Sequence, residues 1–93
     1  MALKFSITYN QVVVEEDIPR LASPWREKIR LAIENRLTVE PELYGKPLRR
    51  SLKGYRKLRV GDYRVVFRIE GTSVKILAIL RRSIVYKVME KRK

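Results

Sequence analysis

Cysteine and histidine are both absent from the 93 residues of this chain. Without thiols there is no disulfide and no thiolate nucleophile, and without imidazole the most common general acid–base group and zinc ligand are missing. Any catalysis must therefore use lysine, arginine, tyrosine or carboxylate side chains. The sequence predicts no metal site and no cofactor.

Long apolar stretches are lacking as well. No run is long enough to cross a bilayer, and residues 1–4 lack the pattern of a secretory signal. We therefore expect a cytoplasmic protein with no membrane partner. Hydrophobic residues make up 45% of the chain, which is ordinary for a folded protein. Because a chain of this length can bury only one small core, we expect a single domain over residues 1–93.

Acidic residues are scarce in the second half of the chain. The whole sequence has 22 lysine and arginine residues against 10 aspartate and glutamate residues, for a formal net charge of +12. Residues 1–45 contain 6 basic and 7 acidic side chains, whereas residues 46–93 contain 16 basic and 3 acidic side chains. A basic surface confined to one half indicates a defined site for a polyanion, and nucleic acid is the first candidate.

The pair Gly61-Asp62 separates two runs that are rich in β-forming residues, which predicts a hairpin with a two-residue turn. Side chains alternate between the two faces of a strand, so the hairpin has a core face and a cationic face. The register pairs Val60 with Tyr63, Arg59 with Arg64, Leu58 with Val65, Lys57 with Val66 and Tyr55 with Arg68.

The cationic face of this hairpin needs a physical explanation. It carries Tyr55, Lys57, Arg59, Arg64, Val66 and Arg68, whereas the core face carries Leu58, Val60, Tyr63, Val65, Phe67 and Ile69. Like charges directly opposed on a sheet are destabilising by up to about 1 kcal/mol per pair. A bound polyanion would remove this repulsion. The alternative is a solvated face whose charges splay into water.

A strand and a short helix are predicted at the start of the chain. Residues 3–8 alternate loosely between apolar and polar side chains, which is typical of a strand. Asn10 is a suitable N-cap for the helix that follows, and Pro19 ends or kinks that helix.

A longer helix is predicted to begin at Ser23-Pro24, where a cap residue precedes a proline. Apolar residues then recur at helical spacing as far as Leu37 or Thr38. Trp25 lies on this apolar stripe, so we interpret it as a core anchor. Residues 40–54 are predicted to be a loop, and its basic side chains form a phosphate-contacting rim or a solvated surface.

The final third of the chain is predicted to be mostly strand. Residues 74–80 are nearly all apolar, which is typical of a central strand. The charged residues 90–93 are expected to fray. The order of strand, two helices and three strands predicts an α+β fold. We expect an antiparallel three-stranded meander with the first strand at one edge, and helices on one face that leave the cationic face open.

With these elements in place, the chain resembles the RelE/ParE superfamily of toxins from type II toxin–antitoxin systems. The resemblance covers nearly the whole chain, including its size and element order. It is carried by the segments Gly45-Lys46-Pro47-Leu48 and Leu58-Arg59-Val60-Gly61-Asp62-Tyr63-Arg64-Val65-Val66-Phe67, and by Arg82 followed by Val85-Tyr86. One departure is Tyr55, which stands where the RelE branch has a second lysine.

The resemblance implies one of two activities. The RelE branch cleaves mRNA in the ribosomal A site, by attack of a ribose 2′-OH on the adjacent phosphorus without a metal ion, and the ParE branch poisons DNA gyrase. We favour the RelE-like activity. The catalytic residues that it implies are Lys57, Arg64, Arg81, Arg82 and Tyr86. The RNA-binding residues expected around them are Lys46, Arg49, Arg50, Lys53, Tyr55, Arg59 and Arg68.

Partners follow from the same resemblance. A cognate antitoxin is expected to wrap the chain with an acidic or amphipathic segment, and either to shield the basic face or to displace the C-terminal segment. The ribosome and mRNA are the expected targets of a RelE-like toxin, and DNA gyrase is the target of a ParE-like one. A non-catalytic RNA- or ribosome-binding module is the third alternative.

Overall fold

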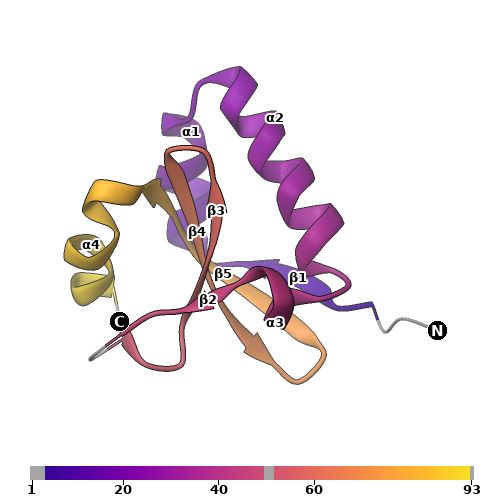
Figure 1. Ribbon diagram of the computed structural model, residues 1–93. Helices are drawn as coiled ribbons and strands as arrows, with labels where there is room; N and C mark the ends of the chain where they lie inside the picture. The colour runs from indigo at the N-terminus through magenta and orange to yellow at the C-terminus, as the bar shows by residue number, and fades with distance from the viewer. Residues whose placement is uncertain (1–3, 50–51, 93) are drawn as a thin grey trace.

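The computed structural model describes residues 4–49 and 52–92. Its five-stranded sheet has the order β1-β5-β4-β3-β2, and β1 (Ser6–Tyr9) lies at an edge, parallel to β5 (Ser73–Arg81). The predicted antiparallel meander is formed by β3 (Arg56–Val60), β4 (Tyr63–Glu70) and β5. The α+β class and the edge position of the first strand are therefore confirmed (Figure 1).

The first helical segment begins as predicted. The side-chain oxygen of Asn10 accepts a hydrogen bond of 3.0 Å from the Val12 amide, which is the geometry of an N-cap. A widened π turn, η1 (Val13–Asp17), leads into α1 (Ile18–Arg20). Pro19 has no N–H to donate, and its ring would clash with a carbonyl one turn earlier, so a wider turn accommodates it.

The second helical segment consists of α2 (Ser23–Ala32) and a last turn in π geometry, η2 (Ile33–Leu37). These bounds confirm the prediction, although the N-cap is Ala22 rather than Ser23. The helices pack on one face of the sheet and form the first core. Its buried residues are Val13, Leu21, Ile29, Ile33, Leu37, Leu58, Tyr63, Val65, Phe67, Val74, Ile76 and Ile79.

Trp25 contributes to the first core, as predicted. It packs against the edge of this core, and its ring lies 5.3 Å from that of Tyr63. The same indole covers the hairpin turn: a Cβ added to Gly61 would lie 2.5 Å from the Trp25 ring. Gly61 also has a φ of 58°, in the left-handed region that favours glycine.

Replacing Gly61 with alanine is therefore expected to destabilise the fold through both backbone strain and a clash. Gly71→Ala is the matched control, because Gly71 has a φ of 61° and no atom within 4 Å of an added Cβ. The control should cost about 1–2 kcal/mol for the left-handed backbone, and Gly61→Ala should cost about 1–3 kcal/mol more for overpacking. Urea denaturation of both variants measures the difference. Equal losses would show that the Trp25 contact contributes nothing.

The predicted hairpin register is confirmed for four of its five pairs. Val60, Arg59, Leu58 and Lys57 face Tyr63, Arg64, Val65 and Val66 in turn. The fifth predicted pair, Tyr55 with Arg68, lies one step beyond this ladder, because β3 begins at Arg56, which pairs with Phe67. The Arg68 guanidinium nevertheless lies over the Tyr55 ring, 5.6 Å from its centroid.

The prediction of a plain loop over residues 40–54 is also wrong. A short helix, α3 (Pro41–Tyr44), begins at Pro41, whose fixed φ suits a first helical turn. It is followed by β2 (Lys46–Pro47), which pairs with β3 opposite Arg56 and Lys57. β2 extends the sheet by a fifth strand that the sequence pattern did not predict.

The expected open face is partly covered. After η4 (Arg82–Ile84), the chain forms α4 (Val85–Arg92), which lies across the sheet from α1 and α2 (Figure 1). α4 and the segment before β3 form a second core of Leu48, Leu52, Val66, Ala78, Leu80, Val85 and Met89. Helices therefore lie on both faces, and the prediction that the C-terminal tail frays is wrong as far as Arg92; Lys93 lies outside the described residues.

A β-bulge in β5 determines which of its side chains face which core. Val66 pairs with Ala78, but the next residue, Phe67, pairs with Ile76, so Leu77 is an extra residue. Before the bulge, Ile76 faces the first core. After it, Ala78 and Leu80 face the second core. This strand is apolar on both sides because it contributes to both cores.

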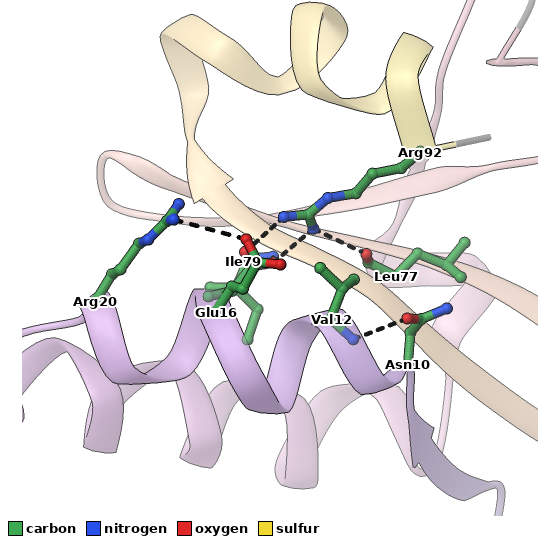
Figure 2. Close-up of polar contacts among 8 residues, drawn as sticks. Asn10, Val12, Glu16, Arg20, Leu77, Ile79 and Arg92 are labelled. Carbon is green, nitrogen blue, oxygen red and sulfur yellow. Dashed lines mark hydrogen bonds and ion pairs between the residues drawn. The ribbon is translucent and has the colours of Figure 1, made fainter.

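Within the described part of the chain, no strand lies beside the edge of β5 beyond the bulge, because β1 pairs only as far as Ile76. Asp17 and Arg92 occupy this edge instead, and we call their contact the Asp17–Arg92 clamp. The Asp17 carboxylate accepts hydrogen bonds from the Ile79 amide at 2.9 Å and from both terminal nitrogens of Arg92 at 2.8 Å. Arg92 also donates to the Leu77 carbonyl at 3.3 Å (Figure 2).

The clamp joins the first helical segment to the last helix around the sheet edge. The Asp17 side chain is fully buried and that of Arg92 is 17% exposed. The hydrogen bonds that Arg92 donates to Asp17 raise the pKa of Arg92 above its ordinary value, so the guanidinium stays charged. No helix among the described residues is long and apolar enough to span a bilayer.

Candidate functional site

Three predicted site residues lie on the sheet face that carries the second core. Leu58 and Val65 face the first core, so their neighbours Lys57, Arg59 and Arg64 point to the other side. Arg59 and Arg64 are directly opposed on adjacent strands. Arg59 is exposed and the other two are half-buried, so a ligand can reach all three.

Arg64 is held in place by the hairpin turn. One terminal nitrogen of its guanidinium donates to the carbonyls of Gly61 and Tyr63, both at 2.9 Å. Burial lowers the pKa of Arg64 from its ordinary value, and the charges of Arg59 and Arg82 lower it further, while Asp62 opposes them. The surroundings therefore disfavour the charged guanidinium, and a bound anion would offset this electrostatic cost.

Tyr86 comes to this face from α4. Its ring centroid lies 5.7 Å from the Lys57 amine, and its side chain is 38% exposed. A surface pocket of about 520 Å³ lies beside it, lined by Arg49, Tyr86, Lys87 and Glu90. An exposed aromatic ring next to cations is an arrangement on which an unstacked base can stack.

The predicted basic pair is Arg81 and Arg82, and in the structure their side chains lie on opposite sides of the sheet. The Arg82 amide donates to the Asp62 carbonyl at 2.9 Å, and its side chain, 65% exposed, lies 3.7 Å from the Asp62 carboxylate near Arg64. Arg81 instead pairs with Tyr63, and its guanidinium lies 5.2 Å from the centroid of that ring, on the first-core side. Only Arg82 therefore belongs to the same surface as Arg64.

Two of the expected RNA-binding residues lie next to this group, because Lys46 pairs with Lys57 and Arg49 lines the pocket beside Tyr86. Lys46, Arg49 and Lys53 are exposed, and Arg50 lies outside the described residues. Tyr55 packs against the second core. Arg68 is less available than expected, because its Nε donates to the Glu70 carboxylate at 2.8 Å and the pair is an ion pair. We call Lys57, Arg59, Arg64, Arg82 and Tyr86 the cationic site.

Two residues beside the cationic site were not predicted from the sequence. Lys87 and Glu90 line the pocket next to Tyr86. Glu90 comes four residues after Tyr86, a spacing that would have placed both on one face if the last segment had been interpreted as a helix. Among the described residues, no group of three or more acidic side chains could hold a metal ion.

Comparison with known proteins identifies the family. A family model described as the ParE toxin of the type II toxin–antitoxin system parDE matches residues 12–86. The chain belongs to this toxin family. Among curated relatives, Toxin RelE of Mycobacterium tuberculosis is 46% identical over 54 residues, and Toxin RelG of the same organism is 45% identical over 53 residues. The matched segments cover 56% and 55% of this chain, and 56% and 61% of the relatives, so the match spans little more than half their length.

Solved structures support the same family and fold. This ParE-family chain superposes on a chain of the toxin–antitoxin complex RelBE2 from M. tuberculosis with a TM-score of 0.80 and 29% identity, covering 87% of this chain and 94% of that one. The RelB–RelE antitoxin–toxin complex from Methanococcus jannaschii gives a TM-score of 0.65 over 85% and 94% of the two chains. At 23% identity, that likeness concerns the fold alone.

Proposed function

We propose that this ParE-family chain is a RelE-like toxin that cleaves mRNA on the ribosome, and therefore acts in the cytoplasm. The observation that carries the proposal is the cationic site: Lys57 lies against the ring of Tyr86, on the same sheet face as Arg64. A cleavable phosphate needs cations around it, and its neighbouring base needs a surface for stacking. The cationic site offers both.

The proposed reaction needs no cofactor. The ribose 2′-OH attacks the adjacent phosphorus, its proton passes to a general base, the role proposed for Lys57, and the bond to the leaving 5′-oxygen breaks. The products are a 2′,3′-cyclic phosphate and a 5′-hydroxyl whose proton comes from water. Arg64 and Arg82 would bind the non-bridging oxygens, where negative charge grows in the transition state.

Arg81 has no part in this proposal, because its guanidinium lies over Tyr63 on the other side of the sheet. Arg59, Lys46, Arg49 and Lys53 would contact phosphates further along the strand, since all four are exposed. A cognate antitoxin is the second proposed partner. Two of the similar structures are complexes of a toxin with its antitoxin, and the repulsion between Arg59 and Arg64 favours an acidic covering segment.

The proposal is tested by incubating the purified chain with translating ribosomes and mapping the 5′ ends of one abundant mRNA. New ends that begin with a 5′-hydroxyl are expected. Bound ribosomes without new ends would leave a non-catalytic binding module and overturn the nuclease.

A second candidate function is favoured by the family model, which describes a ParE toxin. The resemblance implies that toxins of this branch poison DNA gyrase. In that function the cationic site contacts gyrase or DNA and performs no cleavage of RNA. Inhibition of purified DNA gyrase in a supercoiling assay, together with intact mRNA on ribosomes, would establish the ParE-like activity instead.

A further inference from the structure

The contact between Tyr86 and Lys57 depends on how α4 is rotated about its own axis. Tyr86 follows Val85, the first residue of α4, which is buried in the second core. Consecutive residues of a helix point about 100° apart, so a small rotation of α4 swings the Tyr86 ring toward or away from Lys57. Whatever fixes this rotation also fixes the geometry of the cationic site.

The apolar contacts of α4 are not enough to fix it. One stripe of the helix faces the sheet, formed by Val85, Met89 and Arg92 at positions i, i+4 and i+7. A helix of eight residues is unstable alone, so its position is set by what it contacts. Apolar contacts are not directional, and a methionine side chain adapts readily to a shifted neighbour.

Arg92 is the directional contact on this stripe. Its guanidinium binds both oxygens of Asp17 at 2.8 Å and donates to the Leu77 carbonyl, so three hydrogen bonds define its plane. Asp17 is itself fixed by the Ile79 amide. Arg92 is therefore attached to β5 and to the first helical segment, which hold it independently of α4.

We propose that Asp17 and Arg92 are positioning residues for the cationic site. The Asp17–Arg92 clamp holds the end of α4 so that the Tyr86 ring near its beginning lies against Lys57. Neither clamp residue contacts the RNA in this proposal, and both act through Tyr86. The activity arm of the test rests on the proposed function, but the structural arm does not.

The structural arm is an NMR experiment on the purified full chain. The Tyr86 ring shifts the signals of the Lys57 side-chain protons, and Arg92→Ala is expected to abolish that shift, as Tyr86→Ala does. Two controls should retain it: Lys91→Ala, which removes an exposed charge from the same helix, and Ile33→Val, which weakens the first core. An unchanged shift in folded Arg92→Ala would overturn the proposal.

The activity arm is a double-mutant cycle on the rate of a single round of mRNA cleavage. Arg92→Ala alone should slow cleavage about tenfold to a hundredfold through misplacement of Tyr86. In the Tyr86→Ala background it should add less than about twofold, because the two changes remove one interaction. The same loss in both backgrounds would mean that Arg92 acts independently of Tyr86, which overturns the proposal.

Two further outcomes keep the tests separate. If the unmodified chain cuts no mRNA, the proposed function fails, and the NMR arm alone decides the positioning role. If Arg92→Ala does not fold, Asp17→Asn takes its place, because the asparagine oxygen still accepts from the Ile79 amide. Asp17→Asn is expected to reduce the Lys57 shift and the cleavage rate together, and a change in neither would refute the role of the clamp.

Discussion

Arg64→Ala is expected to slow mRNA cleavage by about 10²–10³-fold, the usual loss when one preorganised donor to a growing negative charge is removed. The reason lies in how Arg64 is held. Its two hydrogen bonds to the turn carbonyls fix the guanidinium before the substrate arrives, so no ordering is needed during the reaction. The rate of a single round of cleavage on ribosomes saturated with the toxin measures the effect.

Two companion variants interpret the result. Arg64→Lys keeps the charge but cannot bind phosphate through two parallel donors. Its cleavage rate should therefore lie between that of Arg64→Ala and that of the unmodified chain. Arg20→Ala is the matched control, because this arginine is 72% exposed on α1 and pairs only loosely with Glu16 at 3.6 Å. Cleavage by Arg64→Ala at the rate of the Arg20→Ala control would remove Arg64 from the mechanism.

Asp17→Ala is expected to lower the free energy of unfolding by about 3–5 kcal/mol, the typical loss when one partner of a buried ion pair is removed. The change leaves the Arg92 guanidinium without its carboxylate in a position that is only 17% exposed, and it leaves the Ile79 amide without its acceptor. Urea denaturation monitored by Trp25 fluorescence measures the loss, which is a large share of the stability of a small domain.

The neighbouring Glu16 provides the matched control for this prediction. Its ion pair with Arg20 is exposed on both sides, so Glu16→Ala should change stability by no more than about 1 kcal/mol. Similar midpoints for Asp17→Ala and Glu16→Ala would show that the clamp does not stabilise the fold. Replacing both Asp17 and Arg92 with leucine should recover part of the loss, because no unpaired buried charge would remain.

The sequence predicts the parts of this fold that depend on local signals. Gly61-Asp62 has the right chemistry for a tight turn, so the register next to it follows directly, and Asn10 and Pro24 mark helix starts. α4 could not be found in this way. Its stripe has only Val85 and Met89 as buried apolar residues, and the run of charged residues after Met89 is typical of a solvated tail.

The cationic site also combines residues that a local pattern places with residues that only tertiary packing places. Alternation along the hairpin is enough to place Lys57, Arg59 and Arg64 on one face. The approach of Tyr86 to Lys57 depends on tertiary packing of α4, so the sequence alone could support it only through the resemblance. The resemblance assigns Arg81 to the site together with Arg82, and the apolar run before it gives no sign that the alternation changes within the strand.

The extra residue in β5 has a consequence for how such proteins diverge. A single deletion at Leu77 would restore unbroken alternation and leave Ala78 paired with Val66, so the side chains from Ala78 to Arg81 would keep their present faces. Arg81 would stay beside Tyr63, but the carbonyl that accepts a hydrogen bond from Arg92 would be lost with the deleted residue. One codon lost at this point of the gene would therefore weaken the anchorage of the last helix and leave the charge pattern of the surface as it is.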